Sequence, residues 1–356
     1  MTKKFDYLIV GQGLAGSLLA WRLLQNKQNI LLVDNEHRGC SSMAAAGLVN
    51  PVTGKRLVKA TETEQWLVEA ESLFDTLSKY FKQTFYHPKT MLRLFKDEQQ
   101  RQLLQQRLSD DAYHAYFKQD TDHQADIAPF VNTQGYIRQT QTGFLDIPAL
   151  LDKLGNFFRQ QDSLLSTALN YDELSVEENL LRYRDIEAKN IIFCEGYRAT
   201  NNPWFNWLPF QPAKGDILTI KTQQDLGDNI INRGTWLLPV GNGEYKTGAT
   251  NHWKFADDKP DAEGHAAADS NFRQLFCQQP DYQVVRHQAG VRPATRDKNA
   301  FIGQHPKHSN LFIFNGFGAR GSLTIPYYSK RFCEHLVANK TIPAPVNISR
   351  YYDFAD

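Results

Sequence analysis

The chain has 356 residues, of which 41% are hydrophobic and 22% charged. This length exceeds the usual ~100–200 residues of one domain, so two lobes are expected, and the apolar content excludes a disordered or fibrous chain. Lys and Arg number 40 against 39 Asp and Glu, a formal charge of +1. Such a balance gives no global field that would hold nucleic acid or an anionic membrane.

Cysteine usage, histidine spacing and hydropathy argue against metal-binding, membrane-spanning and secreted proteins. The four cysteines are far apart, and none belongs to a Cys-x-x-Cys pair. The histidines show no metal-ligand spacing, so no metal site is predicted, and the expected compartment is the reducing cytoplasm. No run approaches the ~18 apolar residues of a membrane span, and the first apolar stretch is too short for a secretory signal.

The chain opens with a predicted β-α-β unit. Residues 5–10 (FDYLIV) indicate a buried strand, and residues 17–25 place apolar side chains at helical spacing. Residues 29–34 (NILLVD) indicate a second buried strand, and two such strands are typical of a parallel sheet.

A Gly-x-Gly-x-x-Gly motif, Gly11, Gly13 and Gly16, joins the first strand to the helix. The first glycine permits a tight turn, the second lets the backbone approach a pyrophosphate, and the third lets the helix pack close to the strand. The helix N-terminus, at Leu14 and Ala15, offers backbone N–H groups and a partial positive charge to phosphates. We therefore predict a dinucleotide site here.

Asp34 ends the second strand, where a carboxylate can accept hydrogen bonds from a ribose 2′-OH and would repel the 2′-phosphate of NADP. The motif alone leaves NAD and FAD open. Its position close to the N-terminus, and the small residues of 40–47 (CSSMAAAG) that follow, favour FAD, because a chain of small side chains can lie against an extended cofactor.

The rest of the chain alternates helical and strand-like segments. From Gly215 to about Val291, short β-rich runs with turn residues between them indicate an antiparallel sheet. Residues 109–135 are polar and irregular. Helices are predicted at 62–81, 97–108, 147–160 and 322–338, and further strands at 180–195 and 311–314.

The predicted fold is α/β: a Rossmann-like βαβ FAD-binding domain joined to a mainly antiparallel β substrate domain, with the active site where they meet. No single linker divides the chain, so both domains are expected to be discontinuous. The predicted FAD-binding domain comprises residues 1–80, 136–205 and 290–356, and the predicted substrate domain comprises 81–135 and 206–289.

Five separated segments carry a resemblance to a known family. They are the glycine motif with Asp34, residues 41–48 (SSMAAAGL), 142–146 (TGFLD), 290–303 (GVRP to FIG) and 316–322 (GFGARGS). Together they resemble the D-amino-acid-oxidase superfamily of flavoproteins, which includes glycine oxidase, sarcosine oxidase and the oxidase half of the bifunctional tRNA wobble-uridine modification enzymes. The last segment is most similar to the tRNA-modification oxidase half.

The resemblance implies an FAD-dependent oxidoreductase of the amine and amino-acid oxidase type. Its FAD would be bound non-covalently, since no cysteine adjoins the last glycine-rich turn. Hydride would pass from the carbon beside the amine of a carboxylate-bearing substrate to flavin N5, the imine would hydrolyse, and dioxygen would reoxidise the flavin.

The resemblance also implies roles for particular residues. Arg292 matches the carboxylate-binding arginine of the family, and a planar guanidinium grips a carboxylate with two parallel hydrogen bonds. The alternative is a structural ion pair with an acid such as Asp297. Arg320 could face the flavin, the substrate or water. Beside the glycine motif and Asp34, the expected cofactor-binding residues are Ser42, Ala46, Gly47, Gly196, Gly316, Gly318, Ala319, Arg320, Gly321 and Ser322.

Several alternatives stay open at this stage. The basic cluster of Lys55, Arg56 and Lys59 either binds an anionic substrate or is a solvated face. The expected partners are a small amine or amino acid and an electron acceptor, with no nucleic acid and no membrane span. Competing functions are a tRNA-modifying oxidase acting on a carboxymethylaminomethyl group, a flavoprotein that binds FAD structurally or passes electrons to a partner, and an NAD-dependent dehydrogenase.

Overall fold

The computed structural model describes residues 2–35, 40–54, 56–119, 124–132 and 134–355. The chain forms two compact units, each discontinuous. The first unit comprises Met1–Met43, Ile147–Ala213 and Val291–Asp356, and the second comprises Ala44–Asp146 and Lys214–Gly290.

These units divide the chain at other residues than the sequence suggested. Residues 44–80 and 136–146, expected in the first domain, lie in the second unit, because strands 48–49 and 143–145 pair with each other there. Residues 206–213, expected in the second domain, lie in the first, where the Gln211 N–H donates to the Ala294 carbonyl at 2.7 Å.

The first unit is built on the predicted parallel sheet. Strand β1 (Lys3–Val10) lies between β2 (Ile30–Asp34) and β12 (Ile186–Phe193), parallel to both. The first half of β12 pairs antiparallel with β11, and its second half pairs parallel with β19. The remaining strands are β9 (Leu164–Ser166), β10 (Leu174–Val176), β11 (Leu181–Tyr183), β18 (Phe301–Gln304) and β19 (Leu311–Asn315).

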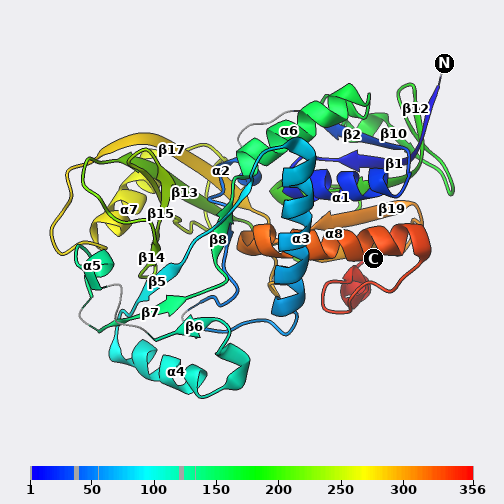
Figure 1. The fold of residues 1–356 in the computed structure, drawn as a ribbon. Coiled ribbons are helices and arrows are strands. Elements are labelled where there is room, and N and C mark those ends of the chain that lie inside the picture. The colour runs from blue at the N-terminus through cyan, green and yellow to red at the C-terminus, as the bar shows by residue number, and fades with distance from the viewer. Residues whose placement is uncertain (1, 36–39, 55, 120–123, 133, 356) are drawn as a thin grey trace. The chain divides into compact units, whose positions relative to one another are not determined.

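Helices pack together beside this sheet. The β-α-β helix packs against the two other long helices of the unit, and these are drawn side by side in Figure 1. The hydroxyl of Tyr7 on β1 donates to the Leu336 carbonyl at 3.0 Å, which ties the sheet to the last helix. The helices are α1 (Leu14–Gln25), α6 (Ile147–Gln160) and α8 (Gly321–Ala338), with a short α2 (Ser41–Ala44).

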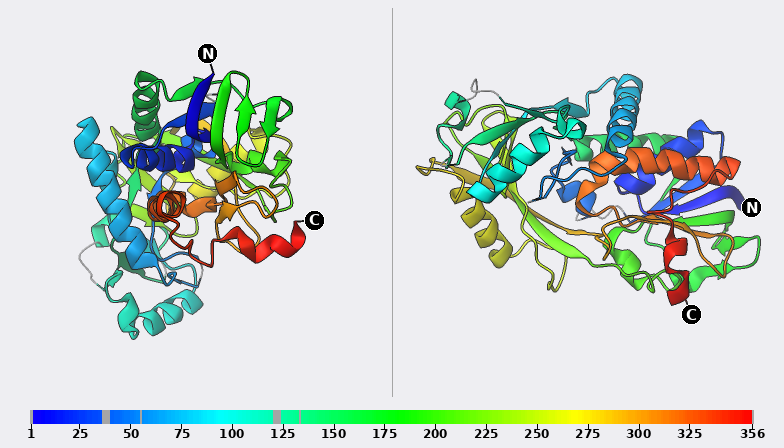
Figure 2. Two further views of the ribbon diagram at one scale, coloured as in Figure 1. Left: turned by 90° about the vertical axis from the view of Figure 1, so that its right-hand side faces the viewer. Right: turned by 90° about the horizontal axis from the view of Figure 1, so that it is seen from below.

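The strand residues that point away from these helices form an apolar core on the opposite face of the sheet. Leu8 and Val10 of β1 and Phe193 of β12 lie in this core, and segments outside the strands supply aromatic rings that cover it. The C-terminal turn η5 (Ile348–Phe354), red in Figure 2, packs beside β18. The covering residues include Tyr171, Trp204, Phe205, Trp207 and Tyr351.

His305, at the end of β18, gives this core a pH dependence. Its ring lies against Phe205, and its Nδ1 accepts a hydrogen bond from the Lys307 N–H at 3.1 Å, which requires the neutral ring. Burial, with a smaller contribution from His308, lowers the pKa of His305 to about 4. Because the unfolded pKa is about 6.5, the neutral ring stabilises the fold above pH ~6.5, and this stability is lost as the pH falls toward 4.

We expect the wild-type free energy of unfolding to fall by about 2 kcal/mol between pH 7 and pH 5 through His305 alone. Urea unfolding of wild type and His305→Asn at both pH values measures this. The variant should be less stable at pH 7 but should lose about 2 kcal/mol less on acidification. An equal loss in both proteins would contradict the assignment.

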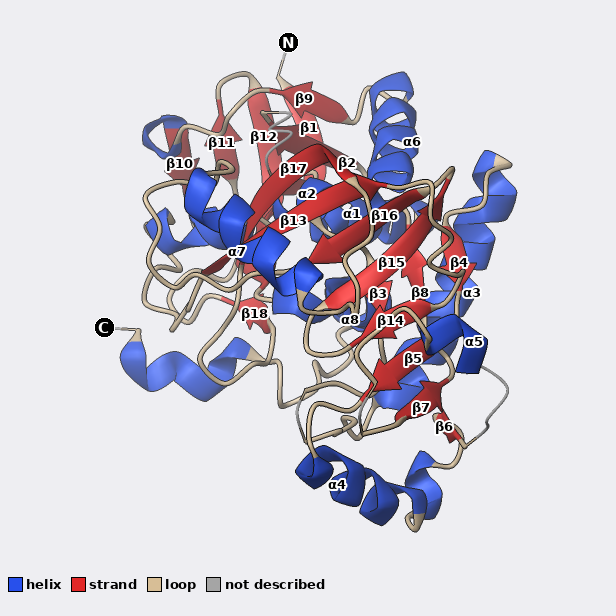
Figure 3. Cartoon of the chain, turned by 90° about the vertical axis from the view of Figure 1, so that its left-hand side faces the viewer, coloured by secondary structure: helices blue, strands red, loops and turns tan. Residues whose placement is uncertain are grey.

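The second unit is built on an eight-stranded sheet in the order β17-β13-β16-β15-β14-β5-β7-β6. Helix α7 (Ala262–Arg273) lies across this sheet (Figure 3), where Ala268 and Phe272 pack against Leu218 and Ile220 of β13. The strands are β5 (Met91–Leu94), β6 (Phe117–Lys118), β7 (Tyr136–Gln139), β13 (Ala213–Lys221), β14 (Ile230–Asn232), β15 (Trp236–Gly241), β16 (Glu244–Gly248) and β17 (Gln283–Arg292).

The predicted antiparallel sheet is therefore present, and in addition β5 and β14 pair in parallel, which joins residues far apart in the chain. A small sheet completes the unit, with β8 (Gly143–Leu145) between β3 (Leu48–Val49) and β4 (Tyr86–Pro88). The predicted helices are α3 (Thr63–Phe81) and α4 (Glu98–Leu108), and α5 (Gln124–Ile127) is short. In the described ranges, no helix combines the length and apolar character that a membrane crossing needs.

Candidate functional site

The predicted cofactor residues of the first unit gather at one end of its sheet. The parallel strands β2, β1, β12 and β19 end there at Asp34, Val10, Phe193 and Asn315. From β1 the chain passes through α1 to β2 on one side, whereas β12 flanks β1 on the other. The carboxyl ends of β1 and β12 therefore border a topological switch point, where open α/β sheets bind ligands.

The glycine motif has the geometry that its sequence predicts. Gly11 has φ +104°, and a Cβ there would lie 2.5 Å from the Cys194 carbonyl oxygen. A Cβ on Gly16 would lie 1.9 Å from the Gly11 carbonyl oxygen, so this glycine lets α1 pack against the turn. Gly13 differs, because a Cβ there would meet only the Ser42 Oγ, at 3.3 Å. The protein does not fill that position, which fits the close approach of a pyrophosphate.

Two side chains fix the polar groups of this turn. The Gln12 N–H donates to Asp34 Oδ2 at 2.8 Å, which orients the carboxylate predicted to bind a ribose. The Leu14 N–H donates to Ser42 Oγ at 3.1 Å, so Ser42 caps a helix start that Gly13 leaves without a side-chain cap. Ser42 thus acts on the predicted site through Leu14.

The turn that follows β12 lies at the switch point of the first unit. Gly196, predicted to bind cofactor, follows Glu195, whose carboxylate accepts hydrogen bonds from the Tyr171 hydroxyl and from Asn202 Nδ2 at 2.8 Å. Burial raises the pKa of Glu195 despite these two donors.

Sequence reasoning missed Asn315, which joins two of these turns. Its side chain is 2% exposed, its Nδ2 donates to the Gly196 carbonyl at 2.8 Å, and its Oδ1 accepts from the Gly316 N–H at 2.8 Å. Gly316 has φ +81°, which favours glycine. The available signal was an asparagine between a buried strand and a glycine, since Asn side chains often hydrogen-bond local backbone.

We expect Asn315→Leu to lose stability and cofactor together, because each buried partner left unsatisfied costs about 1–3 kcal/mol. Asn310→Leu is the matched control: Asn310 is also buried, and its Nδ2 donates to the Glu177 carbonyl at 2.8 Å, but it immediately precedes β19, at the end of the strand opposite Asn315. Both variants should unfold at lower temperature, and only Asn315→Leu should release FAD more readily. Equal FAD retention in the two would contradict this role.

Arg292 lies beside the glycine-rich turn of 316–322. The next residue, Pro293, accepts a hydrogen bond from the Gly318 N–H at 3.3 Å, and a Cβ on Gly316 would lie 2.8 Å from Thr295 Cγ2. Two predicted site segments that are distant in sequence are thus adjacent within the first unit.

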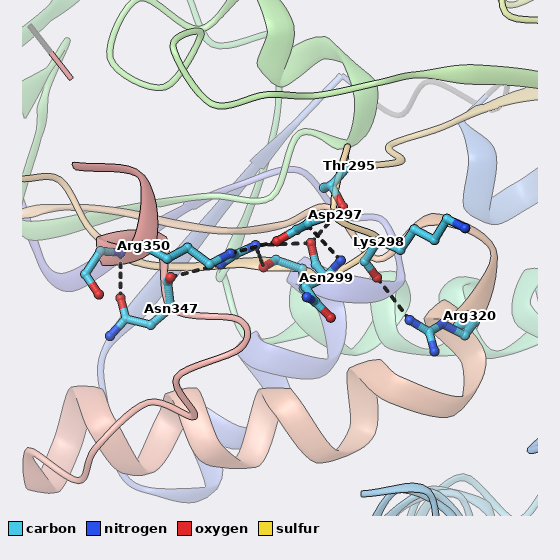
Figure 4. Close-up of polar contacts among 9 residues, drawn as sticks. Thr295, Asp297, Lys298, Asn299, Arg320, Asn347 and Arg350 are labelled. Carbon is cyan, nitrogen blue, oxygen red and sulfur yellow. Dashed lines mark hydrogen bonds and ion pairs between the residues drawn. The ribbon is translucent and has the colours of Figure 1, made fainter. Parts of the chain in front are cut away.

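Figure 4 shows the contacts of the loop that follows Arg292. Asp297, considered above as a structural partner of Arg292, pairs with Arg350 Nε at 2.9 Å. Arg320 donates from Nη2 to the Lys298 carbonyl at 3.0 Å, which ties the start of α8 to the same loop. At least part of the role of Arg320 is therefore to join these two segments.

Other predicted residues belong to the second unit. Ala46 and Gly47 lie there, and a Cβ on Gly47 would fall 1.9 Å from the Leu145 carbonyl oxygen. The close contact of Gly47 with β8 is therefore enough to require a glycine, whether or not a cofactor binds.

In the predicted basic cluster, Lys59 pairs with Glu64 at 2.6 Å, Arg56 is exposed, and Lys55 lies outside the described residues. Among described residues, no group of three or more His, Cys, Asp or Glu side chains is placed to hold a metal ion.

Comparison with known proteins decides the family. The sequence profile of the DAO family, described as FAD dependent oxidoreductase, matches residues 6–335. The chain belongs to this family. The predicted family and fold class are thereby confirmed: the protein is an FAD-dependent oxidoreductase of the DAO family.

The individual relatives have low sequence identity to this chain, but two of them match nearly its whole length. Glycine oxidase of Bacillus subtilis is 21% identical over 96% of this chain and 95% of its own. The bifunctional protein MnmC of Legionella pneumophila, for tRNA 5-methylaminomethyl-2-thiouridine biosynthesis, is 25% identical over 52% of this chain and 32% of its own. The crystal structure of iminodiacetate oxidase from Chelativorans sp. BNC1 has a TM-score of 0.81 at 20% identity and covers 97% of this chain and 98% of that one, which shows the shared fold.

Proposed function

We propose that this DAO family member oxidises an amino acid or secondary amine that carries a carboxylate. The observation that carries the proposal is the position of Arg292, which lies in the same unit as the glycine motif and beside the turn that starts α8. The match to glycine oxidase over nearly the whole chain supports an amino acid or amine as substrate.

Bound FAD supplies the two-electron acceptor for the hydride that leaves the carbon beside the amine. The chain's own contribution is to bind and orient. Arg292 holds the substrate carboxylate through paired hydrogen bonds, which fixes the direction of the neighbouring C–H bond. Helix α8 begins at Gly321 with no side-chain cap, so the partial positive charge of its first turn suits negative charge developing on the reduced cofactor.

We further propose that dioxygen is the final electron acceptor and that the imine is released for hydrolysis. Aerobic turnover of a panel of amino acids and N-substituted glycines, followed by coupled peroxide detection, tests this. Equal amounts of peroxide and of carbonyl product are expected with at least one carboxylated amine. Turnover only with an artificial acceptor would instead favour a dehydrogenase that passes electrons to a partner.

A second candidate is supported by the MnmC match and by the similarity of the turn at 316–322. In this version the substrate is a carboxymethylaminomethyl group on tRNA, whose carboxylate Arg292 would bind in the same way. Salt-dependent binding of tRNA by the purified protein supports it. Oxidation of free amines without tRNA binding supports the small-molecule substrate.

A further inference from the structure

An arginine interrupts the apolar face of the second unit's large sheet. Leu92 and Leu94 of β5 point to the core under α7, so Arg93 points to the opposite face with Met91. In the sheet register, Met91 lies opposite Ile230 of β14, and Leu238 of β15 belongs to the same apolar cluster. Arg93 is thus a cation placed at the edge of an apolar patch.

The hydrogen bonds of Arg93 to other described residues use one of its nitrogens. Nη1 donates to the Val52 carbonyl at 3.2 Å and to Gln139 Oε1 at 3.3 Å. Gln139 is completely buried, and its Nε2 donates to Asn50 Oδ1 at 2.6 Å, which fixes its Oε1 toward Arg93. These contacts hold the guanidinium in one orientation.

The other edge of this guanidinium has no partner among the residues that the structure describes. Within the described part of the chain, no carboxylate lies within 4.0 Å of Arg93, and no acceptor is within hydrogen-bond reach of Nε or Nη2. Nε and Nη2 are not among the fully buried side-chain atoms that lack a hydrogen-bond partner. Both nitrogens are therefore accessible to a ligand. Two parallel donors on one edge are the arrangement that binds a carboxylate or phosphate in two-point fashion.

The electrostatics agree with this geometry. Burial alone lowers the pKa of Arg93, to about 10, so the side chain keeps its charge at neutral pH. A partly buried charge without a counter-ion is costly for a fold, and that cost falls when an anion binds.

We propose that Arg93, held by Val52 and Gln139, forms a binding subsite for a small oxyanion on this face of the second unit's sheet. The ligand is a carboxylate or phosphate group with two oxygens that meet Nε and Nη2. Free malonate and inorganic phosphate carry such groups and serve as probes.

A purely structural role for Arg93 would need only its Nη1 contacts, which anchor the loop at Val52. Thermal unfolding of the FAD-loaded protein with increasing malonate or phosphate, at ionic strength matched with chloride, separates the two roles. Saturable stabilisation is expected in wild type and in Arg292→Leu, since ligand that binds the folded state raises the melting temperature. No anion-specific shift in wild type would overturn the proposal.

Variants then locate the effect. Arg93→Gln should raise the apparent dissociation constant about ten- to a hundredfold, and Arg93→Lys should restore part of the affinity, since it keeps charge but loses the paired donors. Arg101→Gln is the control, because Arg101 is an exposed arginine of the same unit, paired with Glu98. An undiminished shift in both Arg93 variants would overturn the proposal, and if neither folds, the wild-type titration still decides it.

A titration at saturating substrate separates this subsite from the substrate site. Stabilisation by phosphate and malonate should persist there. Its loss would show that these anions bind at the substrate site, which would overturn the proposal. The thermal readout does not depend on turnover, so the subsite can fail while the proposed oxidase activity stands, and the reverse also holds.

Discussion

Gly13→Val is expected to fold but to lose FAD. A Cβ on Gly13 would meet only Ser42 Oγ, at 3.3 Å, and the backbone there, φ −70° and ψ −176°, is open to any residue. The added side chain therefore occupies the space in which a pyrophosphate would approach the turn. We expect FAD to bind about ten- to a hundredfold more weakly, measured by flavin fluorescence on titration of FAD into apoprotein.

Gly16→Ala is the contrasting variant. Its Cβ would lie 1.9 Å from the Gly11 carbonyl oxygen, so the helix must shift whether or not cofactor is present. The melting temperature of the apoprotein should fall in Gly16→Ala and stay close to wild type in Gly13→Val. Full FAD occupancy in Gly13→Val would show that the phosphates do not approach this turn.

Arg292→Leu is expected to raise KM for a carboxylated amine about ten- to a hundredfold, with little change in FAD content. Removal of a charge-assisted contact costs about 1.5–3 kcal/mol, and the loss acts mainly on substrate binding. Steady-state kinetics together with the flavin-to-protein absorbance ratio measure both quantities.

Arg350→Leu is the matched control for this experiment. Arg350 pairs with Asp297 on the loop that follows Arg292, and it also donates from Nη2 to the Ala300 carbonyl at 3.0 Å. Its loss should lower stability and leave KM close to wild type. If the two variants raise KM equally, Arg292 acts through the loop rather than on the substrate.

The order of helices and strands could be predicted because local signals agreed with the fold. The first strand, the glycine turn and the helix from Leu14 each follow from apolar runs, steric needs and spacing within some thirty residues. The antiparallel sheet was predictable for the same reason, since short β-rich runs separated by turn residues became β13, β15 and β16.

The unit boundaries could not be read in this way. They depend on pairings between distant strands, such as Leu48 with Phe144 and Ile230 with Met91, which no local pattern encodes. Asn315 was missed because its importance lies in two backbone groups, one of them more than a hundred residues away, at Gly196. Gly47 presents the opposite problem. It was predicted to bind the cofactor, but its contact with Leu145 is by itself a reason for a glycine at this position.

The central claim is that Arg292 orients carboxylated amines for oxidation by FAD held at the glycine turn. Anaerobic titration of the yellow holoenzyme with glycine and N-substituted glycines, followed by loss of flavin absorbance, tests it most directly. We predict bleaching of wild type by at least one such amine, and bleaching of Arg292→Leu only at ten- to a hundredfold higher concentration. Bleaching at the same concentration by the decarboxylated amine, or by none of these amines, would contradict the account.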